Sequence, residues 1–93
     1  MDEHNEQELA EIRKVLKELL VTNLNLEDIE PEQIKDDEIL FGQGLGLDSL
    51  DAVEIVVLLQ RNFGLEVKDM KEGKKIFYSL DTLARYVLEN RKQ

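Results

Sequence analysis

Apolar residues recur at intervals of three and four along the first part of the chain. They are Leu9, Ile12, Leu16, Leu19 and Leu20, with Val15 beside them, and charged side chains fill most of the other positions. This spacing places the apolar side chains on one face of a helix. The pattern therefore predicts an amphipathic helix over residues 6–21.

The helical pattern stops at Thr22 and does not return before Asp48. The segment between them is acidic, includes Pro31, and carries isolated apolar residues: Leu24, Leu26, Ile29, Ile34, Ile39, Leu40 and Phe41. A connection of about 25 residues is long for a compact domain and is more often functional than idle. We expect its apolar residues to fix the loop against the helices.

A dense apolar run, LDAVEIVVLLQRNF, follows Gly42, Gly44 and Gly46 and predicts a second helix. Asp48 or Ser49 is a favourable N-cap, and Gly64 is placed to end the helix in a left-handed conformation. A short helix is expected over residues 70–75.

Ser79 is the expected cap of a last helix, which fades out at Asn90. Its predicted inner face is Leu80, Leu83, Ala84 and Val87. The chain is therefore expected to form a single all-α domain over residues 1–93, with residues 1–5 as a frayed terminus. Its expected fold is a small four-helix bundle of three main helices and one short helix, with the long loop between helices one and two.

The second helix has more apolar residues than one face requires. One stripe is broad enough to meet the core: Ala52, Ile55, Val56, Leu59 and Phe63. Leu50, Val53 and Val57 form a second stripe, rotated away from the first, with Asp48, Asp51 and Glu54 beside it. Both stripes are buried in one interpretation. In the other, the second stripe is exposed and has the composition of a docking surface rimmed by carboxylates.

The composition limits the chemistry of the chain. It has 93 residues, no cysteine and one histidine, which excludes disulfides, thiolate metal sites and cysteine nucleophiles. No paired acid and base is visible, so no catalytic residue is assigned and an enzyme is not expected. Asp36, Asp37 and Glu38 lack the ligand spacing of a calcium loop, and His4 lies in a polar terminus, so no metal site is expected. The acidic start and the absence of a long apolar run predict a cytoplasmic protein without membrane insertion.

The charge is unevenly distributed. Residues 1–54 hold 16 Asp or Glu against 4 Lys or Arg, whereas residues 55–93 hold 5 against 8, for a total of −9. The acidic front argues against binding of nucleic acid and favours partners with basic surfaces.

Ser49 follows a glycine-bearing loop at the start of the second helix. Its hydroxyl is expected to lie beside free backbone N–H groups and the positive end of the helix dipole, where an attached phosphate is favoured. Nothing nearby in the sequence could activate Ser49 as a nucleophile, so it is either a cap or a serine that another enzyme modifies.

The segment GLGLDSLD at residues 44–51, followed by AVEIVVLL, closely resembles the phosphopantetheine attachment site of acyl carrier proteins. The wider resemblance covers residues 6–90. It implies that Ser49 bears 4′-phosphopantetheine, donated by coenzyme A and installed by a Mg²⁺-dependent phosphopantetheinyl transferase. The terminal thiol of the arm then carries acyl groups as thioesters for fatty-acid or polyketide type synthases, which agrees with the lack of cysteine.

The resemblance also implies two sets of binding residues. The partner-docking positions are Asp48, Leu50, Asp51, Val53, Glu54 and Val57. An acyl pocket between helices would be lined by Ile55, Leu59, Ile76, Leu80 and Ala84, although a packed core would contain the same residues. The expected partners are the transferase and acyl-transferring or synthase enzymes with basic docking surfaces, and the chain is expected to be a monomer.

Two features depart from the usual fatty-acid carriers. Gln60, Arg61 and Asn62 interrupt the acidic face of the second helix, and Lys68, Lys71, Lys74 and Lys75 make the next segment basic. These departures suggest a specialised carrier and not the common fatty-acid carrier. Alternatively, the basic segment is a solvated surface that binds no partner. An aminoacyl or D-alanyl carrier and a non-covalent acidic helical adaptor remain the alternatives.

Overall fold

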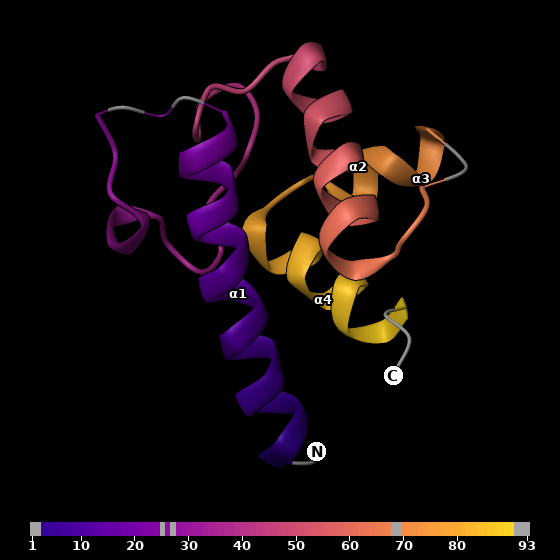
Figure 1. The fold of residues 1–93 in the computed structure, drawn as a ribbon. Helices are drawn as coiled ribbons and strands as arrows, with labels where there is room; N and C mark the ends of the chain where they lie inside the picture. Colours follow the sequence, from indigo (N-terminus) through magenta and orange to yellow (C-terminus); the bar gives the residue numbers. More distant parts are fainter. Residues whose placement is uncertain (1–2, 25, 27, 68–69, 91–93) are drawn as a thin grey trace.

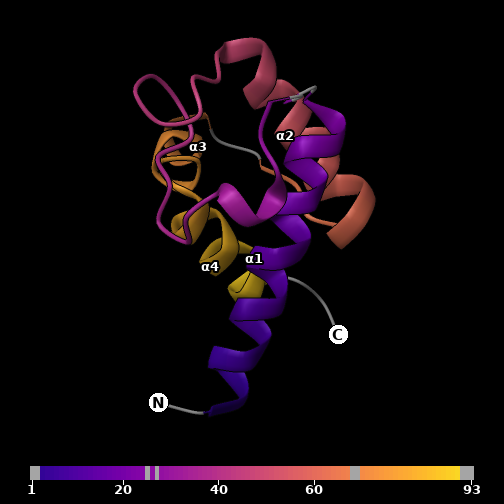
Figure 2. The same ribbon diagram turned by 90° about the vertical axis from the view of Figure 1, so that its left-hand side faces the viewer.

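Four helices form the fold of the computed structural model, which describes residues 3–24, 26, 28–67 and 70–90. α1 (Glu3–Asn23) packs mainly on α4 (Leu80–Asn90) and less extensively on α2 (Ser49–Phe63). α3 (Met70–Ile76) precedes α4, and a single 3₁₀ turn, η1 (Pro31–Gln33), lies in the long loop. Figures 1 and 2 both show the first turns of α1 extending beyond the other helices. The predicted all-α bundle with a long first loop is confirmed.

The core forms where the apolar stripes meet. The buried apolar residues of the helices are Leu9, Ile12, Leu16 and Leu20 of α1, Ile55, Leu58 and Leu59 of α2, Ile76 of α3, and Leu80, Leu83, Ala84 and Val87 of α4. Leu19 is half-buried, and Val15 is 39% exposed at the edge of the stripe. The 3.6-residue period therefore predicted the inner faces of α1 and α4 closely.

The ends of the helices differ slightly from the sequence pattern. α1 begins at Glu3, so His4, expected in a frayed terminus, lies within the helix, while residues 1–2 lie outside the described residues. α3 continues to Ile76, one residue beyond the predicted end. α2 is capped at its start by Asp48 and at its end by Gly64, which follows Phe63 and has a left-handed φ of 67°, as predicted.

The long loop is fixed to the connection between α3 and α4 by backbone hydrogen bonds. The amide of Leu40 donates to the carbonyl of Tyr78 at 3.3 Å, and the amide of Leu80 donates to the carbonyl of Glu38 at 2.8 Å. Ile34 and Leu40 are buried, as expected of residues that fix the loop, but Ile39 is 41% exposed. These bonds bring the loop that precedes Ser49 against the far end of the chain.

Gly44 lies where the loop folds back on itself. The amide of Leu45 donates to the carbonyl of Ile39 at 2.9 Å, and a side chain at Gly44 would overlap that carbonyl. Gly44→Ala is expected to lower the free energy of unfolding by about 1–3 kcal/mol or more. The group that the new methyl would meet is the backbone carbonyl of Ile39, which cannot move aside without distorting the loop. Thermal unfolding followed by circular dichroism measures the loss.

Gly73→Ala is the matched control for Gly44→Ala. Gly73 lies in the middle of α3, and a methyl group there would meet Val67 and Phe77 only at ordinary van der Waals distances of 3.9 and 4.0 Å. Alanine favours a helix interior over glycine by roughly 0.5–1 kcal/mol, so the control should hold or raise stability. Equal losses in the two variants would contradict the close approach at Gly44.

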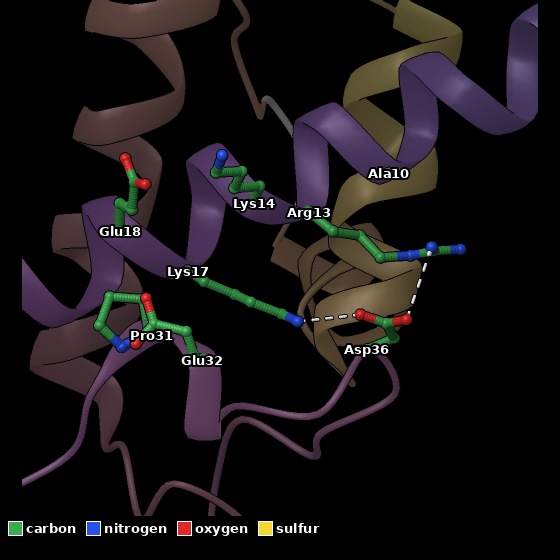
Figure 3. A pocket seen from close by; sticks show the side chains of 8 residues that line it. All are labelled: Ala10, Arg13, Lys14, Lys17, Glu18, Pro31, Glu32 and Asp36. Atoms are coloured by element: carbon green, nitrogen blue, oxygen red, sulfur yellow. Dashed lines mark hydrogen bonds and ion pairs between the residues drawn. The ribbon is translucent and has the colours of Figure 1, made fainter.

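Ion pairs hold α1 to the loop and to α4. Lys17 Nζ lies 2.9 Å from Asp36 Oδ1, and Arg13 lies 3.7 Å from Asp36 and 3.4 Å from Asp81 on α4. Figure 3 shows Arg13 and Lys17 extending from α1 toward Asp36, at a cavity of about 250 Å³. The hydrogen bond from Lys17, followed by the charges of Lys17 and Arg13, lowers the pKa of Asp36, although slight burial opposes the shift.

The lowered pKa of Asp36 predicts a pH dependence of stability. Because the folded pKa is below the unfolded one, the contribution is complete above the ordinary value of about 3.9 and is lost as pH falls through the folded pKa. The melting temperature of Asp36→Asn should lie a few degrees below that of the parent at neutral pH, since exposed pairs contribute less than about 1 kcal/mol. That gap should begin to shrink as pH falls below about 4 and should close at pH values below the folded pKa. A gap that persists in acid, or an equal gap in the exposed control Asp37→Asn, would contradict this role.

Candidate functional site

Ser49 is the first residue of α2, and its side chain is exposed. The preceding loop turns at Gly42 and Gly46, whose φ angles of 64° and 74° are left-handed and suit glycine. Asp48 follows in an extended conformation and caps the helix. The loop and the cap together place the Ser49 hydroxyl at the start of α2, where another molecule can reach it.

The backbone amides of Leu50, Asp51 and Ala52 are already hydrogen-bonded, which corrects the expectation that the amides near Ser49 are free. Asp48 Oδ1 accepts from the amides of Leu50 and Asp51 at 3.0 and 3.2 Å, and the Asp48 carbonyl accepts from the amide of Ala52 at 3.1 Å. Asp51 Oδ2 accepts in return from the amide of Asp48 at 3.0 Å, which completes a capping box. Two carboxylates therefore accept from three of the backbone amides around Ser49.

The second apolar stripe of α2 is exposed over its first two turns. Leu50 is 76% exposed and Val53 57% exposed, whereas Val57 is half-buried. Asp48 and Glu54 are exposed beside them, and Asp51 is half-buried. We call these six residues the docking strip: Asp48, Leu50, Asp51, Val53, Glu54 and Val57. Of the two interpretations of α2, the structure agrees with an exposed second stripe.

The other face of α2 is closely packed. Ile55 and Leu59 are 1% and 0% exposed, and Ala52, Val56 and Phe63 pack against the core as half-buried residues. Leu58 is also buried, although neither predicted stripe includes it. Leu58 follows Ile55 by three residues, and this helical spacing could have identified it as a residue of the buried face. The first stripe therefore forms part of the core.

A cavity of about 580 Å³ opens beside Ser49. It is lined by Ile39 and Phe41 of the loop, Ser49 and Ala52 of α2, Gly73 and Lys74 of α3, and Phe77 and Tyr78 after α3. Carbon atoms form most of its wall. An exposed hydroxyl at the edge of an apolar cavity fits a long, flexible prosthetic group joined to Ser49, because the group could leave toward solvent or lie over the cavity.

The residues predicted to line an acyl pocket lie elsewhere. Ile55, Leu59, Ile76, Leu80 and Ala84 are all 9% exposed or less within the core, and none of them lines the cavity beside Ser49. Their role as pocket residues stays a prediction. The residues that do line the cavity were missed, because the loop and the α3–α4 connection meet only in the folded chain.

The basic segment is only partly described. Lys68 lies outside the described residues, as does the side chain of Lys71, while Lys74 and Lys75 are exposed at the end of α3. Gln60, Arg61 and Asn62 are exposed at the end of α2, so the acidic surface stops before that end. No described group of three His, Asp or Glu side chains is arranged to hold a metal ion, and no described helix could span a membrane.

Known proteins share this sequence pattern. Residues 14–71 match the family described as "Phosphopantetheine attachment site". A protein of Wolinella succinogenes named "Acyl carrier protein" is 38% identical over 76 residues, which cover 82% of this chain and 92% of the relative. One of Chloroherpeton thalassium with the same name is 33% identical over 82 residues, or 88% of this chain and 95% of the relative. A third, of a Sulfurovum species, is 41% identical over 54 residues, or 58% of this chain and 67% of the relative.

Proposed function

The chain belongs to the acyl carrier protein family, and we propose that it carries acyl groups as thioesters on a 4′-phosphopantetheine arm attached to Ser49. Members of this family are carriers and not enzymes, and phosphopantetheine is their prosthetic group. The observation that carries the assignment of Ser49 is its exposed position at the start of α2, beside the apolar cavity and within the matched segment.

Ser49 supplies the oxygen in the attachment reaction. Its Oγ forms a bond to the phosphorus of the pantetheine phosphate of coenzyme A, the pyrophosphate bond breaks, and adenosine 3′,5′-bisphosphate leaves. The hydroxyl proton passes to a base of the transferase, because no described side chain of this protein hydrogen-bonds to Ser49 Oγ. Once bound, the arm supplies a thiol that forms thioesters with acyl groups.

Loading with a broad-specificity phosphopantetheinyl transferase tests this function. The apo protein is incubated with coenzyme A, Mg²⁺ and the transferase, and its intact mass is measured. We expect a gain of one phosphopantetheinyl group. A mass that stays unchanged, while a known carrier is loaded under the same conditions, would rule the function out.

The docking strip is the surface that we propose for the transferase and for acyl-transferring and synthase enzymes. Its exposed apolar residues, Leu50 and Val53, offer area to bury, and Asp48 and Glu54 rim them with negative charge. Residues 1–54 contain 16 acidic against 4 basic side chains, so the field around the strip attracts basic partner surfaces. Since Gln60, Arg61 and Asn62 end the acidic face of α2, we propose partners that contact mainly the front of the helix.

Glu54→Lys is expected to weaken partner binding without loss of fold. Glu54 is exposed on α2, so the change reverses a charge at the rim of the strip and leaves the core untouched. Binding to the transferase should weaken by up to about tenfold at low salt, mainly through a slower association rate, and less at high salt. Surface plasmon resonance at two salt concentrations measures both effects.

Glu89→Lys makes the same charge change on α4, where Glu89 is also exposed, and serves as the control for Glu54→Lys. It alters the net charge equally but lies away from the strip. We expect it to weaken binding much less. Equal effects of the two variants would show that total charge matters and the position of Glu54 does not.

A further inference from the structure

Carboxylates already accept hydrogen bonds from three backbone amides at the start of α2. The amides of Leu50 and Asp51 already donate to Asp48, and the amide of Asp48 donates to Asp51. A phosphodiester on Ser49 would therefore add a negative charge beside two carboxylates that already accept from those three amides. Like charges within a few ångströms repel, so a nearby cation would stabilise the loaded form.

Lys74 is the cation that shares the cavity with Ser49. Among the eight residues that line this cavity, Lys74 is the one with a positive charge. It lies in the last turn of α3, is exposed, and makes no ion pair with the described residues. A lysine side chain is long and flexible, with three rotatable donors, and suits binding of a phosphate as a point charge. Its ammonium group is thus free to pair with an anion at the edge of the cavity.

We propose that Lys74 binds the phosphodiester of the phosphopantetheine arm on Ser49 and so positions the start of the arm over the apolar cavity. This inference rests on the proposed attachment to Ser49. Since Phe41, Phe77 and Tyr78 line the same cavity as Lys74, an arm held there begins against apolar surface instead of extending directly into solvent. The docking strip binds the partner enzyme next to Ser49, and Lys74 sets the direction in which the arm extends from Ser49.

The test compares Lys74→Gln with Lys75→Gln in the full-length protein. Lys75 is the neighbouring residue in the same last turn of α3, is also exposed, and does not line the cavity. Each variant is loaded with phosphopantetheine, and complete loading is verified by intact mass before anything else is measured. If no protein loads, the proposed function fails. If all load, the role of Lys74 is tested separately.

Two readouts report on the contact in the loaded proteins. The ³¹P resonance of the single phosphodiester should move in Lys74→Gln and stay in place in Lys75→Gln. The change in melting temperature on loading should be less favourable in Lys74→Gln by about 2–4 °C at low salt, as expected for a partly exposed charge pair. High salt should reduce that difference. Lys74→Arg, which keeps the charge, should behave like the parent.

Three results would overturn the proposal. One is the same ³¹P shift and the same thermal response in the Lys74 and Lys75 variants. Another is a Lys74→Arg variant that behaves like Lys74→Gln, because the charge would then not be the cause. The third is a difference that appears only after an acyl group with its own carboxylate has been added to the arm, in which case Lys74 binds the cargo and not the phosphodiester.

Discussion

Ser49→Ala is expected to abolish phosphopantetheinylation completely. The variant lacks the oxygen that forms the phosphodiester, and the chain has one other serine, Ser79, which is only 5% exposed. The Ser79 hydroxyl accepts a hydrogen bond from the amide of Thr82 at 3.2 Å and caps α4. Intact mass after incubation with coenzyme A and a transferase should show no adduct. Because Asp48 and not Ser49 caps α2, stability should change by less than about 0.5 kcal/mol.

Ser79→Ala gives the matched control for Ser49→Ala. It removes the other serine hydroxyl of the chain and should still accept one phosphopantetheinyl group. Loss of the cap is expected to lower the free energy of unfolding by about 1 kcal/mol, which circular dichroism would detect. An adduct on Ser49→Ala, or a loss of loading in Ser79→Ala while the protein remains folded, would contradict the assignment.

Leu59→Ala is expected to have the largest effect on stability. Leu59 is 0% exposed and belongs to the hydrophobic core, so its truncation removes buried apolar contacts and leaves a cavity. Such changes cost about 2–5 kcal/mol, which lowers the melting temperature of a small domain by more than about 8 °C. Chemical denaturation followed by circular dichroism measures the free energy directly.

Leu50→Ala makes the same chemical change on the same helix. Leu50 is 76% exposed, so its truncation should alter stability by no more than about 0.5 kcal/mol. The pair thus separates the core face of α2 from the docking strip. If Leu59→Ala cost as little as Leu50→Ala, Leu59 would not be a packed core residue, and the prediction that it lines an acyl pocket would gain support.

The helices were predictable because their signals are local. The period of Leu9, Ile12 and Leu16 located α1, and the same spacing identified the buried face of α4. Asp48 marks the start of α2 and Gly64 marks its end, through side-chain and backbone preferences that act within a few residues. Exposure of Leu50 and Val53 could be posed as one of two alternatives from the sequence. It could not be decided, because it depends on which neighbours α2 meets.

The cavity was not predictable, because its walls meet through contacts that are distant in the sequence. Ile39 and Phe41 reach Phe77 and Tyr78 only because the loop is hydrogen-bonded to the α3–α4 connection, through Leu40 and Leu80. The occupied amides at the start of α2 were also missed, although the spacing of Asp48 and Asp51 is that of a capping box with aspartate at its third position. That spacing would have shown that the helix terminus was already satisfied by carboxylates.

Mass spectrometry of the protein isolated from its own host tests the central claim most directly. After proteolysis, the peptide that contains Ser49 is measured before and after treatment with neutral hydroxylamine, which cleaves thioesters. We predict that this peptide carries phosphopantetheine on Ser49 and that part of it carries an acyl group that hydroxylamine releases. A Ser49 peptide that is unmodified in growing cells, or an acyl group bound elsewhere on the chain, would contradict the account.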